Sequence, residues 1–270
     1  MRLCSFIIAL WFVLGGTVAA QPEPISQWNL PNGLQEISGL AVASPTSVFA
    51  HNDEYGIVYE VSLTSGKVTR AFALGDPTIA EDFEGIASTD DRIYLITSDG
   101  RLFEADIGDH RGRVRYNVYD TGIGDLCEVE GLSVGLAPGE FLILCKQALK
   151  KKSRLKLQIY KWNINERRPP AQSWLDIAYK DFLKKSEYPD FRAAGLEWDA
   201  REGRVVVISS RSSSLYFFNE EGRLLDDLAL PSSAHAQSEG VTISPAGEFI
   251  VADEGKKRGP GRLSKYRIQH

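Results

Sequence analysis

The sequence predicts an all-β fold, a five-bladed β-propeller, from two observations. Short apolar runs such as RIYLIT, FLILCK and RVVVIS recur along the 270 residues between clusters of Gly, Pro, Asp and Ser, which is typical of many short strands. A glycine-containing strand motif also recurs five times, with successive glycines separated by 46, 46, 64 and 45 residues. A unit of about 45 residues has the size of one four-stranded propeller blade. The repeat glycines are Gly39, Gly85, Gly131, Gly195 and Gly240.

Residues 1–20 are expected to be a signal peptide rather than part of this fold. The segment starts with the basic Arg2, continues with an apolar stretch and ends in a V-x-A pattern formed by Val18 and Ala20, as secretory signals do. We therefore expect an exported protein, periplasmic or secreted, that begins at Gln21. The alternative is an uncleaved signal that anchors the chain in the inner membrane. No later segment is apolar enough to span a membrane, so no stable span is expected after signal cleavage.

The composition is that of a globular protein with an acidic balance. Hydrophobic residues make up 43% and charged residues 25% of the chain, with a net charge of −5. This charge argues against a nucleic-acid partner, because sequence-independent binding needs a broad basic surface. The chain also lacks the G-x-S-x-G, P-loop and H-E-x-x-H motifs of several enzyme classes.

Each repeat unit follows the same order of elements. The glycine strand leads through a turn to a strongly apolar second strand, and a third strand follows, such as VYEVSL, LFEADI or LQIYKW. A fourth strand such as VTRAFAL or RLLDDLAL closes most units. The five glycine strands are EISGLAV (36–42), FEGIAS (83–88), VEGLSV (129–134), AAGLEW (193–198) and SEGVTI (238–243).

The ends of the chain and the one long spacing complete the domain prediction. The last unit is one strand short, and the segment ISQWNL (25–30) is expected to complete it, which leaves no open sheet edge. Residues 21–270 then form a single domain. The long spacing predicts an insertion in the third blade, at about 146–189, made of charged, loop-like segments. The alternative is a six-bladed propeller with one degenerate blade inside this insertion.

The geometry of a propeller brings acidic residues from several blades together. First strands line the central channel, so their starts and the ends of the second strands converge on one mouth. Close carboxylates repel one another unless a cation neutralises them, and a set of oxygen ligands suits Ca2+. The alternative is that these acids are solvated or bonded to neighbouring blades. The candidate metal ligands are Glu36, Asp53, Glu84, Asp99, Glu130, Glu239, Asp253 and Glu254.

Two basic residues of the third and fourth units fall on the same face as the acids, and the third unit also carries two cysteines. Lys146 and Arg211 are candidates for binding an anion such as a phosphorylated small molecule; the alternative is a charged, exposed loop. Cys127 and Cys145 would meet an oxidising compartment after export. They are either a disulfide or two free thiols.

The repeats resemble the SdiA-regulated (YjiK/CarP) family of bacterial exported propellers. The resemblance rests on ISGL…HNDEYGIVYEVSL, FEGIA…RLFEADI, AGLEWD…GRVVVISSRSSSLYFFNEEGRLL and AQSEGVTISPAGEFIVADE, and it covers about 34–268. It implies a calcium-associated, phytase-like propeller. The chain departs from a symmetric acidic ring at Ala194 and Cys145. The acidic positions that the resemblance implies are Asp53, Glu84, Glu130, Glu239 and Glu254.

Three functions follow from these features. The first is an exported calcium-binding propeller with a role in calcium homeostasis or ligand binding at the channel mouth. The second is a calcium-dependent, phytase-like phosphomonoesterase or esterase, with Glu84 or Glu130 as base and Lys146 or Arg211 as the phosphate clamp. The third is a protein-interaction platform that uses the insertion. The sequence assigns no catalytic residue and names no protein partner.

Overall fold

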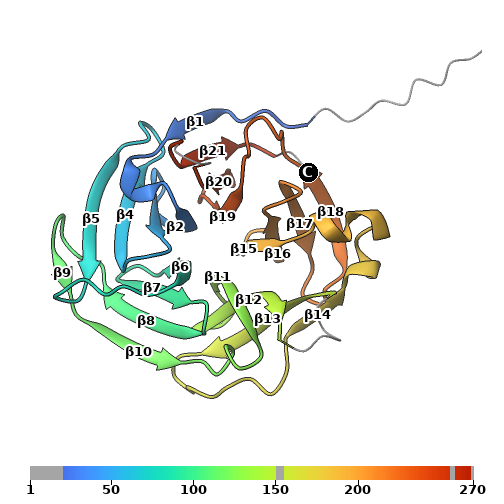
Figure 1. The fold of residues 1–270 in the computed structure, drawn as a ribbon, viewed down its shortest axis with the longest axis horizontal. Helices are drawn as coiled ribbons and strands as arrows, with labels where there is room; N and C mark the ends of the chain where they lie inside the picture. The colour runs from blue at the N-terminus through green and yellow to red at the C-terminus, as the bar shows by residue number, and fades with distance from the viewer. Residues whose placement is uncertain (1–20, 150–154, 256–258, 269–270) are drawn as a thin grey trace, which may run out of the picture.

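The fold is a five-bladed β-propeller, as the sequence predicts. A computed structural model describes residues 21–149, 155–255 and 259–268, so the predicted signal peptide lies outside the described residues. Five antiparallel sheets, here called blades one to five in chain order, surround a central axis (Figure 1). No sixth sheet occurs within the described residues. No helix of the described part is both long and apolar enough to cross a membrane.

In blades one to four, the strands follow one another outward from the axis in chain order. Blade one contains β2 (Ile37–Ser44), β3 (Ser47–Asn52), β4 (Ile57–Ser62) and β5 (Val68–Leu74). Blade two contains β6 (Phe83–Ser88), β7 (Arg92–Thr97), β8 (Arg101–Asp106) and β10 (Tyr116–Asp120). Blade three contains β11 (Cys127–Val134), β12 (Glu140–Ala148), β13 (Lys156–Asn163) and β14 (Leu175–Ala178). Blade four contains β15 (Ala193–Asp199), β16 (Arg204–Ser209), β17 (Ser214–Phe218) and β18 (Leu224–Ala229).

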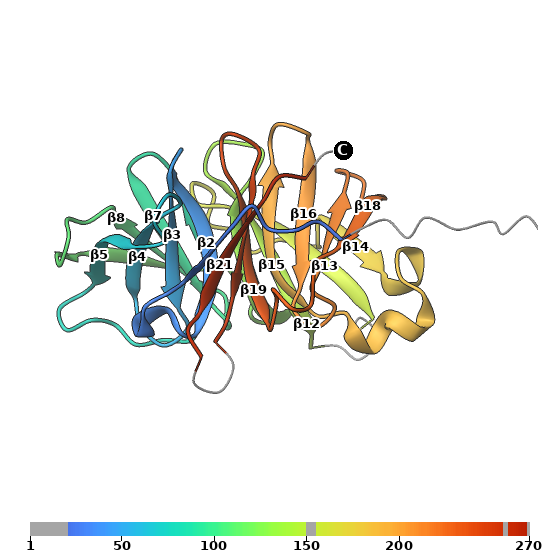
Figure 2. The ribbon, with the colours of Figure 1, turned by 90° about the horizontal axis from the view of Figure 1, so that it is seen from above.

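The N-terminal strand closes the ring, as expected. Blade five contains β19 (Ser238–Ile243), β20 (Phe249–Asp253), β21 (Arg262–Tyr266) and, at its outer edge, β1 (Ser26–Asn29). Trp28 of β1 lies opposite Leu263 of β21 in an antiparallel pair, and Figure 2 shows the two strands side by side. Sewing the first strand to the last ties blade five to the start of the chain and covers an edge that would otherwise be open.

The predicted insertion in blade three is shorter than the sequence suggested. Within 146–189, β13 and β14 are the two outer strands of the blade itself. Leu175 and Ile177 are buried while Asp176 between them is exposed, an alternation of period two that marks a half-buried strand. Two short 3-10 helices, η3 (Tyr179–Asp181) and η4 (Lys185–Asp190), follow β14, and another, η1 (Asn32–Leu34), precedes β2.

A loop of blade two adds a strand that the sequence did not predict. β9 (Arg113–Val114) pairs in parallel with β5 and becomes a fifth strand of blade one. The amide of Ala73 donates to the Gly112 carbonyl oxygen at 3.0 Å. The loop thus binds blade two to the outer edge of its neighbour.

The repeat glycines lie where neighbouring blades approach most closely. A Cβ atom on Gly85 would lie 2.6 Å from the Leu132 backbone nitrogen, closer than real Cβ contacts. A Cβ atom on Gly240 would lie 3.2 Å from Gly39 Cα. A side chain at Gly85 would force the adjacent backbone to shift, and one at Gly240 would be unusually tight. The hydrophobic cores fill the spaces between blades farther out.

Candidate functional site: the acidic mouth of the channel

A β-bulge directs the residue before each repeat glycine toward the channel. In blade two, Phe83 lies opposite Thr97 and Gly85 lies opposite Ile96, so Glu84 between them has no opposite residue. The same shift of register occurs before the glycine in every blade. A bulge bends the strand and changes the direction of the side chain it contains. The five bulge residues are Ser38, Glu84, Glu130, Ala194 and Glu239.

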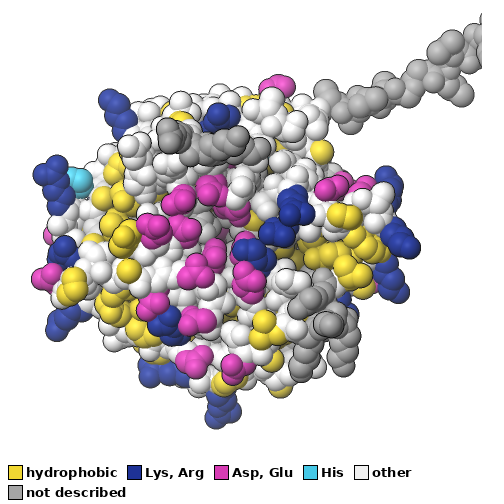
Figure 3. Space-filling model, in the orientation of Figure 1, with side chains coloured by type: hydrophobic (Ala, Val, Ile, Leu, Met, Phe, Trp, Pro, Cys, Tyr) yellow, Lys and Arg dark blue, Asp and Glu magenta, His cyan; other side chains and the backbone are white. Residues whose placement is uncertain are grey.

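Carboxylates from four blades line one cavity of about 160 Å³ at this mouth. Three of them are bulge residues, and the others lie just before first strands or just after second strands. Figure 3 shows acidic side chains gathered around the centre of the face seen in Figure 1. Ser38, Lys146 and Gln237 complete the polar lining. The acids that line the cavity are Glu36, Asp53, Glu84, Glu130, Glu239 and Glu254.

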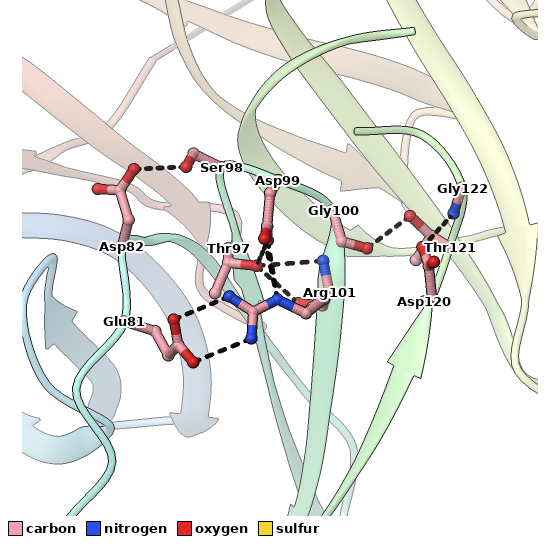
Figure 4. Close-up of polar contacts among 10 residues, drawn as sticks. All are labelled: Glu81, Asp82, Thr97, Ser98, Asp99, Gly100, Arg101, Asp120, Thr121 and Gly122. Atoms are coloured by element: carbon pink, nitrogen blue, oxygen red, sulfur yellow. Dashed lines mark hydrogen bonds and ion pairs between the residues drawn. The ribbon is translucent and has the colours of Figure 1, made fainter. Parts of the chain in front are cut away.

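Asp99, a predicted ligand, does not line this cavity. Arg101 Nε lies 2.9 Å from an oxygen of Asp99, and the same guanidinium donates two hydrogen bonds to Glu81, at 2.9 and 2.8 Å. Thr97 also donates a hydrogen bond to Asp99 (Figure 4). Asp99 is therefore part of a paired network on blade two.

Turn length explains why Asp99 and Asp53 differ although both follow their repeat glycine by fourteen residues. In blade one the partner of Ile37 is Asn52, so Asp53 comes one residue after the paired strand. In blade two Thr97 already pairs with Phe83, because the hairpin is one residue shorter. Asp99 thus comes two residues after the paired strand.

Asp253 and Arg211 also lie away from the cavity. Asp253 is 2% exposed and sits inside blade five, where His235 Nδ1 is 2.7 Å from its Oδ2 and Ser238 donates to its Oδ1. Arg211 lies at the groove between blade four and the insertion and donates to the Pro189 carbonyl oxygen at 3.1 Å. Neither residue shares the mouth with the other predicted ligands.

Lys146 provides the positive charge within the acidic mouth. Its Nζ lies 2.8 Å from Glu130 Oε2 and 3.4 Å from Glu128 Oε1. Burial disfavours the charged amine, but the attraction of Glu130 and Glu84 outweighs it, so the pKa of Lys146 lies above its ordinary value. The amine predicted to bind an anion is thus already paired with carboxylates in this structure.

The bulge glutamates hold protons near neutral pH. Burial raises the pKa of Glu130 to about 8, with the charge of Glu84 adding to the effect. Burial likewise raises the pKa values of Glu84 and Glu239 to about 7, although Lys146 partly opposes the shift at both. A bound cation would favour the ionised forms, so binding should release protons from this group.

Asp53 carries a buried oxygen that lacks a partner. Its Oδ1 accepts no hydrogen bond from the described residues, and burial, followed by the charge of Glu36, raises its pKa. A buried acceptor without a partner is costly, and a cation in the cavity would satisfy it. Among the described residues, no three acidic, His or Cys side chains are already close enough together to hold a metal ion. Binding would therefore need side-chain rearrangement.

A disulfide fixes the strand that carries Lys146. Cys127, at the start of β11, is bonded to Cys145 of β12, with their Cα atoms 5.7 Å apart. Lys146 follows Cys145 directly, so the crosslink lies beside the acidic mouth. The sequence left this pair open between a disulfide and two thiols.

Sequence reasoning missed Gln237, which lines the cavity and donates a hydrogen bond to Glu254. The signal was present: Gln237 precedes Gly240 by three residues, as Glu36 precedes Gly39. Glu128, which contacts Lys146, occupies the same position before Gly131. Residues three positions before these repeat glycines therefore line the acidic mouth or contact its lysine, beside the bulge residues.

Comparisons with known proteins support the fold and leave the activity open. No family model matches the chain, and no curated protein matches it significantly in sequence. The structure of Myxococcus xanthus glutaminyl cyclase superposes with a TM-score of 0.54 at 15% identity, over 91% of this chain and 95% of that one. A Bacteroides thetaiotaomicron protein of unknown function gives 0.47 at 15% identity, over 86% and 56% of the two chains. At 15% identity, the likeness to the cyclase shows the propeller fold alone.

Proposed function

We propose that this protein is an exported β-propeller of the SdiA-regulated (YjiK/CarP) type that binds Ca2+ at the acidic mouth of its channel. The observation that carries the proposal is the convergence of six carboxylates on one cavity of about 160 Å³. Calcium takes six to eight oxygen ligands in flexible arrangements, which suits carboxylates contributed by separate blades.

The chemistry of the lining residues fits a divalent cation better than an anion. Asp53 offers a buried oxygen without a partner. Besides burial, the charge of Glu36 raises the pKa of Asp53, and the charges of Glu36 and Asp53 raise the pKa of Glu254. All three residues line the cavity. On the other side, the pairing of Lys146 with Glu130 reduces the repulsion among the bulge glutamates. Lys146 neutralises only part of the negative charge of the six carboxylates, and a calcium ion near Asp53 would neutralise more of it.

Because Lys146 is already paired with carboxylates, we propose calcium binding in preference to the phosphatase function. A phosphate clamp needs cationic groups that face the substrate. Lys146 is held between Glu130 and Glu128, and Arg211 lies at a different groove. We therefore propose a binding role, in calcium homeostasis or ligand capture, without turnover.

Thermal unfolding of the mature protein tests the calcium site. Calcium at 100 times its dissociation constant should stabilise the fold by about 2.7 kcal/mol relative to EDTA. Asp53→Asn should lose this stabilisation, because it removes the charge at the unpartnered oxygen. Asp99→Asn is the matched control, since Asp99 belongs to the Arg101 network, and it should retain the full effect.

Two results would contradict the proposal: an unchanged melting temperature in calcium for the wild-type protein, or an equal response of the Asp53 and Asp99 variants. Phosphate release from a panel of phosphomonoesters, measured with and without calcium, separates binding from hydrolysis. Calcium-dependent release abolished by Glu84→Gln would favour the esterase function instead.

A further inference from the structure

The opposite mouth of the channel holds a second cavity of different chemistry. This cavity, of about 500 Å³, lies where the first strands end and enter their turns. Its size is within the usual range of small-molecule sites. Apolar side chains form just over half of its lining, namely Ala41, Val42, Ala43, Pro45, Ile86, Ala87, Val134 and Pro245.

The carboxyl group of Glu197 on β15 reaches this cavity from the channel wall. Ser133 donates a hydrogen bond to its Oε1 at 3.2 Å, and Thr242 donates to its Oε2 at 3.0 Å. The Trp198 amide in turn donates to Ser133 Oγ at 3.1 Å. Hydroxyl groups from both neighbouring blades thus fix the orientation of the carboxyl.

Glu197 retains unused acceptor capacity and has no basic partner. A carboxylate has about four lone-pair sites, and the hydroxyl groups of Ser133 and Thr242 occupy two of them. No Lys or Arg is among the described residues that line the cavity, and the other acid there is Asp90, which is exposed. Asp199, the next acid along β15, is paired with Arg204 at 3.0 Å.

The two mouths are separate sites. The channel between them, lined by the repeat glycines, has a volume of about 10 Å³, which is about enough for one water molecule. A ligand at Glu197 therefore makes no contact with the carboxylates of the acidic mouth.

We propose that the cavity at Glu197 binds a small organic ammonium ion, a primary amine on a short apolar body. The ammonium group would donate hydrogen bonds to Glu197, and the apolar body would lie against the alanine wall. One carboxylate in an apolar cavity offers too few ligands for a metal ion but matches a single positive charge with adjacent hydrocarbon.

Ammonium binding should strengthen as the pH rises through neutrality. Burial raises the pKa of Glu197 to about 7, against the hydrogen bonds from Thr242 and Ser133. Alkylamines stay protonated well above this value. Between about pH 6 and pH 8, the ligand charge is therefore constant while the Glu197 charge increases.

Calorimetric titration of the mature protein with n-butylammonium, against uncharged n-butanol, tests the proposal. At pH 8 we expect n-butylammonium to bind at least about tenfold more tightly than n-butanol, and Glu197→Gln to remove this preference. Glu221→Gln, at an exposed position in the turn between β17 and β18 of the same blade, is the matched control and should bind as the wild-type protein does. Ala43→Leu should weaken the binding of both ligands, because the larger side chain fills the cavity without changing its charge. This variant tests the site if Glu197→Gln fails to fold.

The proposal is overturned if n-butylammonium does not bind, if n-butanol binds equally well, or if Glu197→Gln binds the ammonium ion as tightly as the wild-type protein does. If calcium still stabilises Glu197→Gln, the calcium proposal stands whether or not the cavity at Glu197 binds an ammonium ion.

Discussion

The two mouths of the channel are built from the same five strands, yet one is charged and the other is largely apolar. At the acidic mouth, bulges turn residues such as Glu84 and Glu130 toward the axis. At the opposite mouth, the regular residues two positions after the glycines face the channel, and these are small or hydroxylated except for Glu197. One register shift per strand therefore lets a single repeat present two surfaces of different chemistry.

The largest expected effect concerns the charge balance at the acidic mouth. Lys146→Met should destabilise the fold by about 3 to 5 kcal/mol at pH 8.5, because Glu130, which is 4% exposed, loses its cationic partner and must either stay charged while unpaired or take up a proton. Denaturant unfolding measures this loss. Lys156→Met, which breaks the more exposed pair with Asp176, is the control and should cost less than about 1 kcal/mol. Equal losses in the two variants would show that Lys146 is not specifically required.

The next effect concerns the glycines that separate the mouths. Gly85→Ala should cost about 3 kcal/mol, because its Cβ would meet the Leu132 backbone nitrogen at 2.6 Å. Gly131→Ala should cost about 1 kcal/mol, since the atom nearest its Cβ is the end of the Leu196 side chain, at 3.0 Å. Chemical denaturation of the two variants compares them directly. A Gly131 variant as unstable as the Gly85 variant would contradict the difference in packing.

The pH dependence of stability compares the carboxyls of the two mouths. The folded-state pKa values of Glu84, Glu239 and Glu197 are about 7, above the ordinary value of 4.5. The folded protein therefore binds more protons than the unfolded chain between about pH 4.5 and pH 7, and stability without calcium should fall as the pH rises through this window. Since one pKa unit corresponds to about 1.4 kcal/mol, each buried carboxyl should contribute roughly 3 kcal/mol across this window.

Unfolding free energies measured from pH 5 to pH 8 check this dependence. The double variant Glu84→Gln/Glu239→Gln should flatten the curve about twice as much as Glu197→Gln does. Calcium should restore stability at high pH in Glu197→Gln but not in the double variant. A wild-type stability that rises with pH over this range would refute the assignment of raised pKa values.

The smallest effect concerns acids that are near the mouth but already paired. Arg101→Lys keeps the charge but loses the two-pronged contact with Glu81. It should cost about 1 kcal/mol or less, because the pair is partly exposed, and calcium binding should stay unchanged. Calorimetry with calcium checks the second point. A large change in calcium affinity would place this network within the site.

The sequence by itself determined the number of blades and the way the ring closes. Both are visible in the chain because every blade repeats the same glycine strand, and because β1 supplies the strand that blade five lacks. It also identified the acids that line the cavity. Positions counted from the repeat glycines fall where first strands begin and second strands end, and both lie at this mouth. The third strand of blade three was recognised as LQIYKW, but its outermost strand, Leu175–Ala178, was assigned to the insertion because it is too short to stand out among charged neighbours.

Only the tertiary structure decided which side chains meet. Counting from the glycine cannot separate Asp53 from Asp99, because hairpins of different length shift the offset by one residue. The pairing of Lys146 with Glu130 depends on a bulge that local sequence does not reveal. The contact of Glu197 with Thr242 joins two blades. This last contact depends on the distance between two blades, which is set by the packing of the whole ring.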